Sequence, residues 1–127
     1  SFTGQLDPEA LAELSAKAWL GVNLLESQSL NYYYSLANKF FDYAQAGVPQ
    51  LCMDFPEYRS LNQQFEVAVL CSSLEPEQIA RQIMDLRKSP ETYSRLQHNS
   101  KLAAQKWLWQ NEEPELLAVY KGVFKAV

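Results

Sequence analysis

The sequence is poor in the features that mark several classes of protein. It has one histidine and two cysteines, Cys52 and Cys71, and neither cysteine belongs to a CxxC or Cys/His ligand motif. Both cysteines lie inside short apolar runs, so we expect buried thiols in strands rather than a disulfide or a metal site. This use of cysteine fits a reducing, cytoplasmic location.

Basic runs and long apolar runs are also missing. The 11 Lys and Arg residues are scattered among 15 Asp and Glu residues, and the net charge is −4. A nucleic-acid surface or an anionic-membrane surface needs clustered positive charge, so neither partner is expected. No apolar run approaches the roughly 20 residues that a membrane-spanning helix requires.

What the sequence does contain is enough apolar side chain for a packed core. Hydrophobic residues make up 47% of the 127 positions. A chain of this length is typical of one domain, which buries roughly two-thirds of the surface that the unfolded chain exposes. We therefore expect residues 1–127 to form a single domain.

Four short apolar stretches predict β-strands. They are residues 1–4, 20–25, 48–53 and 66–71, of which the first is interpreted as the end of a strand. The last three lack a regular alternation of apolar and polar residues. This pattern is typical of strands that are covered on both faces, as in a parallel sheet.

Helical patterns fill the intervals between these stretches. Asp7 is expected to cap a helix that begins at Pro8, and Gly47 is expected to end a helix over residues 36–46. Three further helices are predicted to begin at prolines and to cover residues 56–64, 76–86 and 90–107.

The end of the chain contains helical patterns only. Pro114 is expected to interrupt the pattern before a final helix over residues 116–124. Strands that alternate with helices, joined by long crossovers, predict an α/β fold. The expected architecture is a partial doubly wound, Rossmann-like parallel sheet of about four strands with extra C-terminal helices.

A candidate ligand site follows the strand at 20–25, because open α/β sheets bind ligands at the carboxyl ends of their strands. Unpaired backbone amides at residues 35–38, the helix dipole and Lys39 would together suit a phosphate or a diphosphate. Asp42, one turn further along, could accept hydrogen bonds from two neighbouring hydroxyls such as those of a ribose. The alternative is that these polar residues only cap and solvate a helix, while the tyrosines at 32–34 pack under a loop.

The residues "GVNLLESQSLNYYYSLANKFFDYAQAGVPQLCMDFPEYRSL" carry a resemblance to a known family. They resemble the nucleotide-sugar-binding half of glycosyltransferases of the GT-B architecture, closest to the retaining, family-4-like group and to a bacterial subgroup with the pattern "SLPNKLFEYMAAGVPV…SDFPE". The resemblance implies that the donor diphosphate contacts Ser35, Leu36, Ala37, Asn38 and Lys39, and that Asp42 contacts the ribose. It places the donor sugar and base near Glu26, Ser29, Leu30, Asn31, Tyr32, Tyr33 and Tyr34.

The same resemblance implies a role in building a polysaccharide or a glycolipid. The substrate would be a nucleoside-diphosphate sugar, with no cofactor, no metal and no catalytic residue in this chain. An N-terminal acceptor domain of the same protein would lie outside residues 1–127, so we expect the chain alone to have no transferase activity. We expect a cytoplasmic location, with any association with the inner membrane made only through that other domain.

Three residues depart from the family pattern. Asp42 stands where Glu is usual, Ala37 stands where Pro is usual, and Tyr34 occupies the position of a common acid. Two other functions are kept open beside this one: a noncatalytic nucleotide-binding module, and a receiver-type signalling domain of flavodoxin-like fold.

Residues outside this motif have weaker functional indications. Asp54 follows a predicted strand and would either contact the donor loop or cap the helix that begins at Pro56. His98 lies on a polar helix face and is not expected to be catalytic. Trp107 and Trp109 are expected to serve packing and chain reversal.

Overall fold

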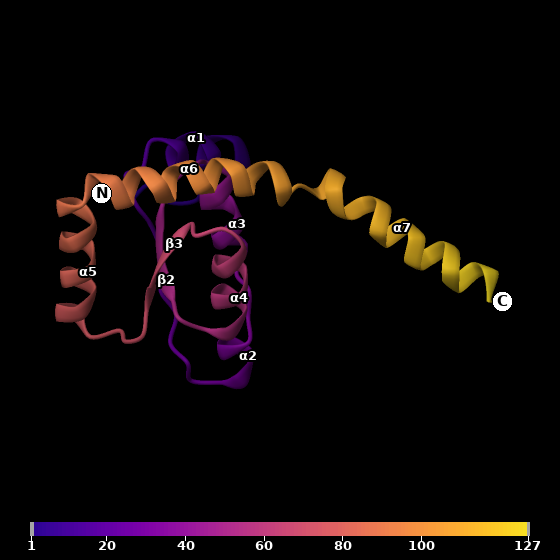
Figure 1. The fold of residues 1–127 in the computed structure, drawn as a ribbon, viewed down its shortest axis with the longest axis horizontal. Coiled ribbons are helices and arrows are strands. Elements are labelled where there is room, and N and C mark those ends of the chain that lie inside the picture. The colour runs from indigo at the N-terminus through magenta and orange to yellow at the C-terminus, as the bar shows by residue number, and fades with distance from the viewer. Residues whose placement is uncertain (1, 127) are drawn as a thin grey trace.

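The computed structural model describes residues 2–126 and shows an α/β fold built on a three-stranded parallel sheet (Figure 1). The strands are β1 (Gly21–Asn23), β2 (Gln50–Met53) and β3 (Ala68–Cys71), in the spatial order β1-β2-β3. Val22 lies beside Leu51 in the register. Three of the predicted strands are thus confirmed, each shorter than the apolar run that predicted it.

The fourth predicted strand, over residues 1–4, is wrong. Residues 2–4 form no strand, and Ser1 lies outside the described residues. Gly4 has a φ of +71°, a left-handed conformation that an extended strand does not contain. Within residues 2–126, β1 is therefore an edge of the sheet with β2 as its single neighbour.

Helices cover both faces of the sheet. α3 (Asn38–Gln45) and α4 (Pro56–Gln64) lie on one side, and α5 (Pro76–Lys88) lies on the other (Figure 1). α1 (Pro8–Ala16) packs beside α3. Asp7 caps α1 as predicted, because its carboxylate accepts a hydrogen bond from the Ala10 amide at 2.8 Å.

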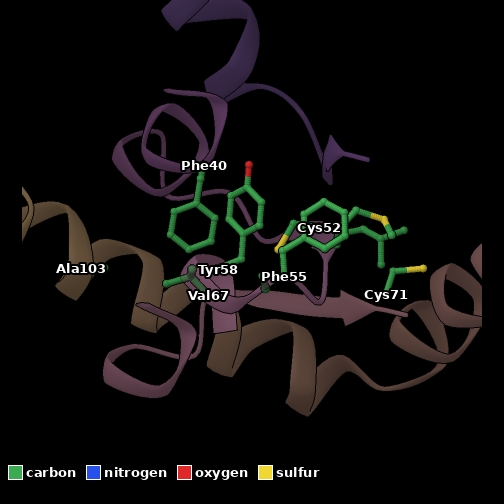
Figure 2. Packing of buried hydrophobic residues seen from close by; sticks show 10 residues of the cluster. Phe40, Cys52, Phe55, Tyr58, Val67, Cys71 and Ala103 are labelled. Carbon is green, nitrogen blue, oxygen red and sulfur yellow. The ribbon is translucent and has the colours of Figure 1, made fainter. Parts of the chain in front are cut away.

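The core lies around β2 and the inner sides of α3 and α4. Phe40 of α3 and Tyr58 of α4 are fully buried, with ring centroids 5.4 Å apart (Figure 2). The side-chain amide of the buried Gln50 donates a hydrogen bond to the carbonyl oxygen of Phe40 at 2.9 Å. These contacts fix α3 against the start of β2.

α6 (Pro90–Lys106) lies across the amino ends of the strands (Figure 1). Its Tyr93 ring stacks on Trp19, just before β1, at a centroid distance of 5.2 Å. Its Arg95 pairs with Glu66, just before β3, at 3.0 Å. A single helix thereby joins elements that are far apart in the sequence.

The last helix, α7 (Trp109–Lys125), leads away from the rest of the molecule (Figure 1). It continues through Pro114, so the predicted interruption there is wrong. The chain changes direction instead at Trp107 and Leu108, whose backbones leave the helical region. Pro114 has no backbone N–H, so the Gln110 carbonyl loses its donor within the helix. Water can donate a hydrogen bond to that carbonyl instead, because the helix is exposed.

Candidate functional site

The carboxyl ends of the strands meet at the edge of the sheet opposite α6. The loop after β1 leads there to the short helix α2 (Leu30–Tyr33), which lies beyond this edge (Figure 1). Ser29 caps α2, its hydroxyl oxygen accepting the Tyr32 amide at 3.4 Å. The Tyr33 ring lies 5.3 Å from the ring of Phe55, which follows β2. The loops after β1 and β2 are therefore in contact.

The helix that follows α2 begins at Asn38, not at Ser35, and this corrects the predicted set of unpaired amides. The Ser35 amide and hydroxyl both donate to the Tyr32 carbonyl, at 3.2 and 2.8 Å, which closes α2. The Ala37 amide donates to the Tyr58 hydroxyl at 3.0 Å. Two of the four amides that were expected to face a ligand are thus already used within the chain.

Three amides at the start of α3 remain without an acceptor. Among residues 2–126, the amides of Leu36, Asn38 and Lys39 make no hydrogen bond, whereas the Phe40 amide donates to the Ala37 carbonyl at 3.0 Å. No side chain of the described residues caps this helix. Unpaired amides at a helix start, where the dipole is positive, are suited to an anion such as phosphate.

Tyr58 of α4 holds the start of α3 in place. Its ring is fully buried between the rings of Phe40 and Phe55, and its hydroxyl points out of this cluster (Figure 2). That hydroxyl accepts the Ala37 amide, so α4 anchors the residue that precedes α3. The position of the unpaired amides therefore depends on a side chain from another helix.

Lys39 and Asp42 line a groove of about 520 Å³ between α3 and α1. Its other lining residues are Pro8, Leu11, Ala12, Ser15, Ala16, Tyr43, Gln45 and Ala46. Lys39 and Asp42 are exposed, and neither has an ion-pair partner among residues 2–126. They share a face as predicted, but Asn38 borders a different hollow, with Phe41 and Trp107.

The loop residues that were assigned to the donor sugar and base lie at the same edge and are mostly exposed. Leu30 is 75% exposed and Tyr34 is 57% exposed, and Asn31 and Tyr32 are exposed as well. Tyr33 is half-buried against Phe55, as a packing role requires. Glu26 accepts a hydrogen bond from Gln28.

Asp54 makes a contact that was not predicted. Its carboxylate pairs with Arg59 at 2.7 Å, and the Arg59 guanidinium also donates to the Asp54 carbonyl at 3.1 Å. Asp54 therefore does not cap α4, whose N-cap is Phe55. The hydrogen bond from Asp54, and then its charge, raise the pKa of Arg59 above its ordinary value. Arg59 is therefore a cation at this edge of the sheet. The sequence could have indicated this, because Arg59 lies one turn into the helix that begins at Pro56.

The two cysteines are buried free thiols, as predicted. Burial, with smaller contributions from the charges of Asp54 and Cys71, raises the pKa of Cys52 to about 12. Cys52 therefore stays protonated at neutral pH and is a poor nucleophile. His98 lies exposed on α6.

Neither a metal site nor a membrane-spanning helix is found among residues 2–126. Within residues 2–126, no group of three or more His, Cys, Asp or Glu side chains is placed to hold a metal ion. None of the helices in that range combines the length and the hydropathy needed to cross a membrane.

Comparison with known proteins adds no relative. The chain matches no protein-family model, no curated protein and no solved structure at a significant level. The case for a function therefore depends on the site itself and on the motif in the sequence.

Proposed function

We propose that the chain binds the nucleoside-diphosphate part of a nucleotide sugar at the start of α3. In this role it is the donor-binding portion of a GT-B, family-4-like glycosyltransferase that transfers a sugar to a polysaccharide or glycolipid acceptor. The observation that carries the proposal is the set of unpaired amides at Leu36, Asn38 and Lys39 beside the groove that Lys39 and Asp42 line. The three-stranded parallel sheet is compatible with a Rossmann-like domain.

The diphosphate is placed at the unpaired amides. The helix dipole and the Lys39 ammonium favour negative charge there, and no acid of the first turn opposes it. Asp42 is three residues beyond Lys39, a rise of about 4.5 Å along the helix. An ionised carboxylate only accepts hydrogen bonds, so Asp42 suits a pair of neighbouring ribose hydroxyls.

The groove and the loop after β1 supply the remaining contacts with the proposed nucleotide sugar. Leu11 and the Tyr43 ring form apolar walls next to Asp42, against which a flat base can lie. The exposed phenols of Tyr32 and Tyr34 stand on the loop side, where the donor sugar is placed. Transfer itself also requires an acceptor held against the donor, and we assign no catalytic residue in this chain.

An NMR titration of the 127-residue chain tests the proposal. We expect UDP or GDP, or their sugars, to shift the amide signals of Leu36, Asn38 and Lys39 in a concentration-dependent way. Lys39→Ala and Asp42→Asn should each weaken binding by roughly tenfold, as expected for the loss of a hydrogen bond to a charged group. Asp85→Asn and Lys88→Ala on α5 remove exposed charges of the same type far from the groove and should leave binding unchanged.

The ligand series also separates the alternatives. Equal affinity of Asp42→Asn and the unaltered chain for UDP would remove the ribose role of Asp42. If no nucleotide shifts any amide of residues 36–39, the proposal fails. If acetyl phosphate and Mg²⁺ alone shift amide signals near Asp54, the receiver-type signalling domain is favoured instead.

A further inference from the structure

The side chains of β1 are placed the opposite way from those of an ordinary edge strand. Val22 is 47% exposed, whereas Asn23, the last residue of the strand, is only 5% exposed. A register shifted by one residue would bury the valine and expose the asparagine, because successive side chains of a strand point to opposite faces. The chain buries the polar residue instead, and exceptions of this kind are expected at functional sites.

The buried Asn23 has a hydrogen-bond donor that the chain does not use. Among residues 2–126, its side-chain nitrogen is covered and has no hydrogen-bond partner. Gln50, a buried polar residue of the neighbouring strand, does use its side-chain amide, which donates to the Phe40 carbonyl. A covered donor without an acceptor is rare in folded proteins, because it loses its hydrogen bonds to water and gains none in return.

The Asn23 side chain lies on the face of the sheet that α3 covers. Gly21, two residues earlier, shares this face, and a Cβ atom added to Gly21 would lie 2.5 Å from the Tyr43 ring of α3. Two strand residues advance about 6.6 Å towards the carboxyl edge. α3 runs the opposite way, back to the amino edge where β2 begins, so four residues before Tyr43 lies Lys39, about 6 Å nearer the carboxyl edge. Asn23 is therefore about level with the first turn of α3.

An unused donor of the sheet thus lies beside unused donors of the helix. The backbone amides of Leu36, Asn38 and Lys39 make no hydrogen bond within residues 2–126. Asn23 adds a side-chain donor from β1, on which α3 packs. Donors from two elements that converge at the positive end of a helix dipole are suited to the oxygens of a phosphate group.

We propose that Asn23 is a binding residue of the nucleotide site, and that its side-chain amide donates a hydrogen bond to an oxygen of the donor diphosphate. The inference rests on the proposed function and adds a contact from the sheet to it. Because the Asn23 nitrogen is covered in the unliganded chain, binding includes a small shift at the start of α3 that opens it to the phosphate. No side chain of residues 2–126 caps α3, so this shift breaks no capping bond.

Substitution by valine separates a binding role from a structural one. Asn23→Val removes the unpaired amide and places an apolar, β-branched side chain at a buried strand position, which strands favour. We expect the midpoint of urea unfolding to stay the same or rise, while affinity for UDP and for inorganic pyrophosphate falls roughly tenfold. An asparagine that served only the fold would give a lower midpoint and unchanged affinity. Val22→Thr, on the exposed face of the same strand, is the matched control and should leave affinity unchanged.

A second measurement uses the unaltered 127-residue chain. In an NMR titration with pyrophosphate, the side-chain amide signals of Asn23 should shift together with the backbone amide signals of Leu36 and Lys39. Two results would overturn the inference while the proposed function stands: an Asn23→Val chain that binds as tightly as the unaltered one, or backbone signals that shift while those of the Asn23 side chain do not. If neither UDP nor pyrophosphate shifts any of these signals, the proposed function fails and this inference fails with it.

Discussion

At the amino edge of the sheet a 17-residue helix, α6, lies across the starts of the strands, whereas the carboxyl edge carries loops and the four-residue helix α2. The amino edge is held by side-chain contacts next to the first and the last strand of the sheet: Tyr93 stacks on Trp19, just before β1, and Arg95 pairs with Glu66, just before β3. The carboxyl edge has unpaired amides at Leu36, Asn38 and Lys39.

The difference indicates a division of roles between the two edges. Backbone groups at the amino edge are covered, so changes there should alter the free energy of unfolding. Polar groups at the carboxyl edge are left available on a rigid scaffold, which is where α/β proteins bind ligands. Changes there should alter binding more than stability, except where a residue anchors the edge to the core.

The largest expected effect is at the amino edge. Leu96 of α6 is 1% exposed, so Leu96→Ala leaves a cavity and should lower the free energy of unfolding by roughly 2–5 kcal/mol. Leu102→Ala, on an exposed part of the same helix, should cost far less. Urea unfolding measures both. A Leu96→Ala chain that loses nucleotide affinity while folded would contradict the separation of the two edges.

A smaller effect is expected where the carboxyl edge meets the core. Tyr58→Phe keeps the buried ring but removes the acceptor of the Ala37 amide, and should lower the free energy of unfolding by about 1–3 kcal/mol. Because this contact anchors the start of α3, affinity for a nucleoside diphosphate should fall several-fold as well. Faster hydrogen exchange at Ala37 would identify the lost bond.

The matched control for Tyr58→Phe is Tyr34→Phe, which removes the hydroxyl of an exposed tyrosine. Its effect on the free energy of unfolding should stay within about 0.5 kcal/mol. If both variants unfold alike, the Tyr58 hydroxyl does not anchor the edge.

The parts of the fold that depend on local sequence could be predicted. Continuous apolar runs located three strands, Asp7 located the start of α1, and Gly47, with a φ of +69°, located the end of α3. In each case the cause lies within a few residues. A strand covered on both faces needs apolar side chains, and a left-handed residue after a helix favours glycine.

The details of the candidate site depend on residues that are distant in the sequence. The Ala37 amide is used by Tyr58, 21 positions away, and this contact has no local signal. The Ser35 amide is used because α2 forms, and a four-residue helix is too short to show periodicity. The shared face of Lys39 and Asp42 could be predicted, because it follows from helix geometry alone.

The smallest expected effects are at two exposed ion pairs, one at each edge. Glu66–Arg95 and Asp54–Arg59 both join half-exposed side chains, at 3.0 and 2.7 Å. In double-mutant cycles each coupling should be about 0.2–1 kcal/mol and should fall as salt concentration rises, because exposed charges are screened. The edges should nevertheless differ when ligand is present. Saturating UDP should change the Asp54–Arg59 coupling, since Arg59 lies at the binding edge, and should leave the Glu66–Arg95 coupling unchanged. Equal responses of the two pairs to UDP would show that the edges are not functionally distinct.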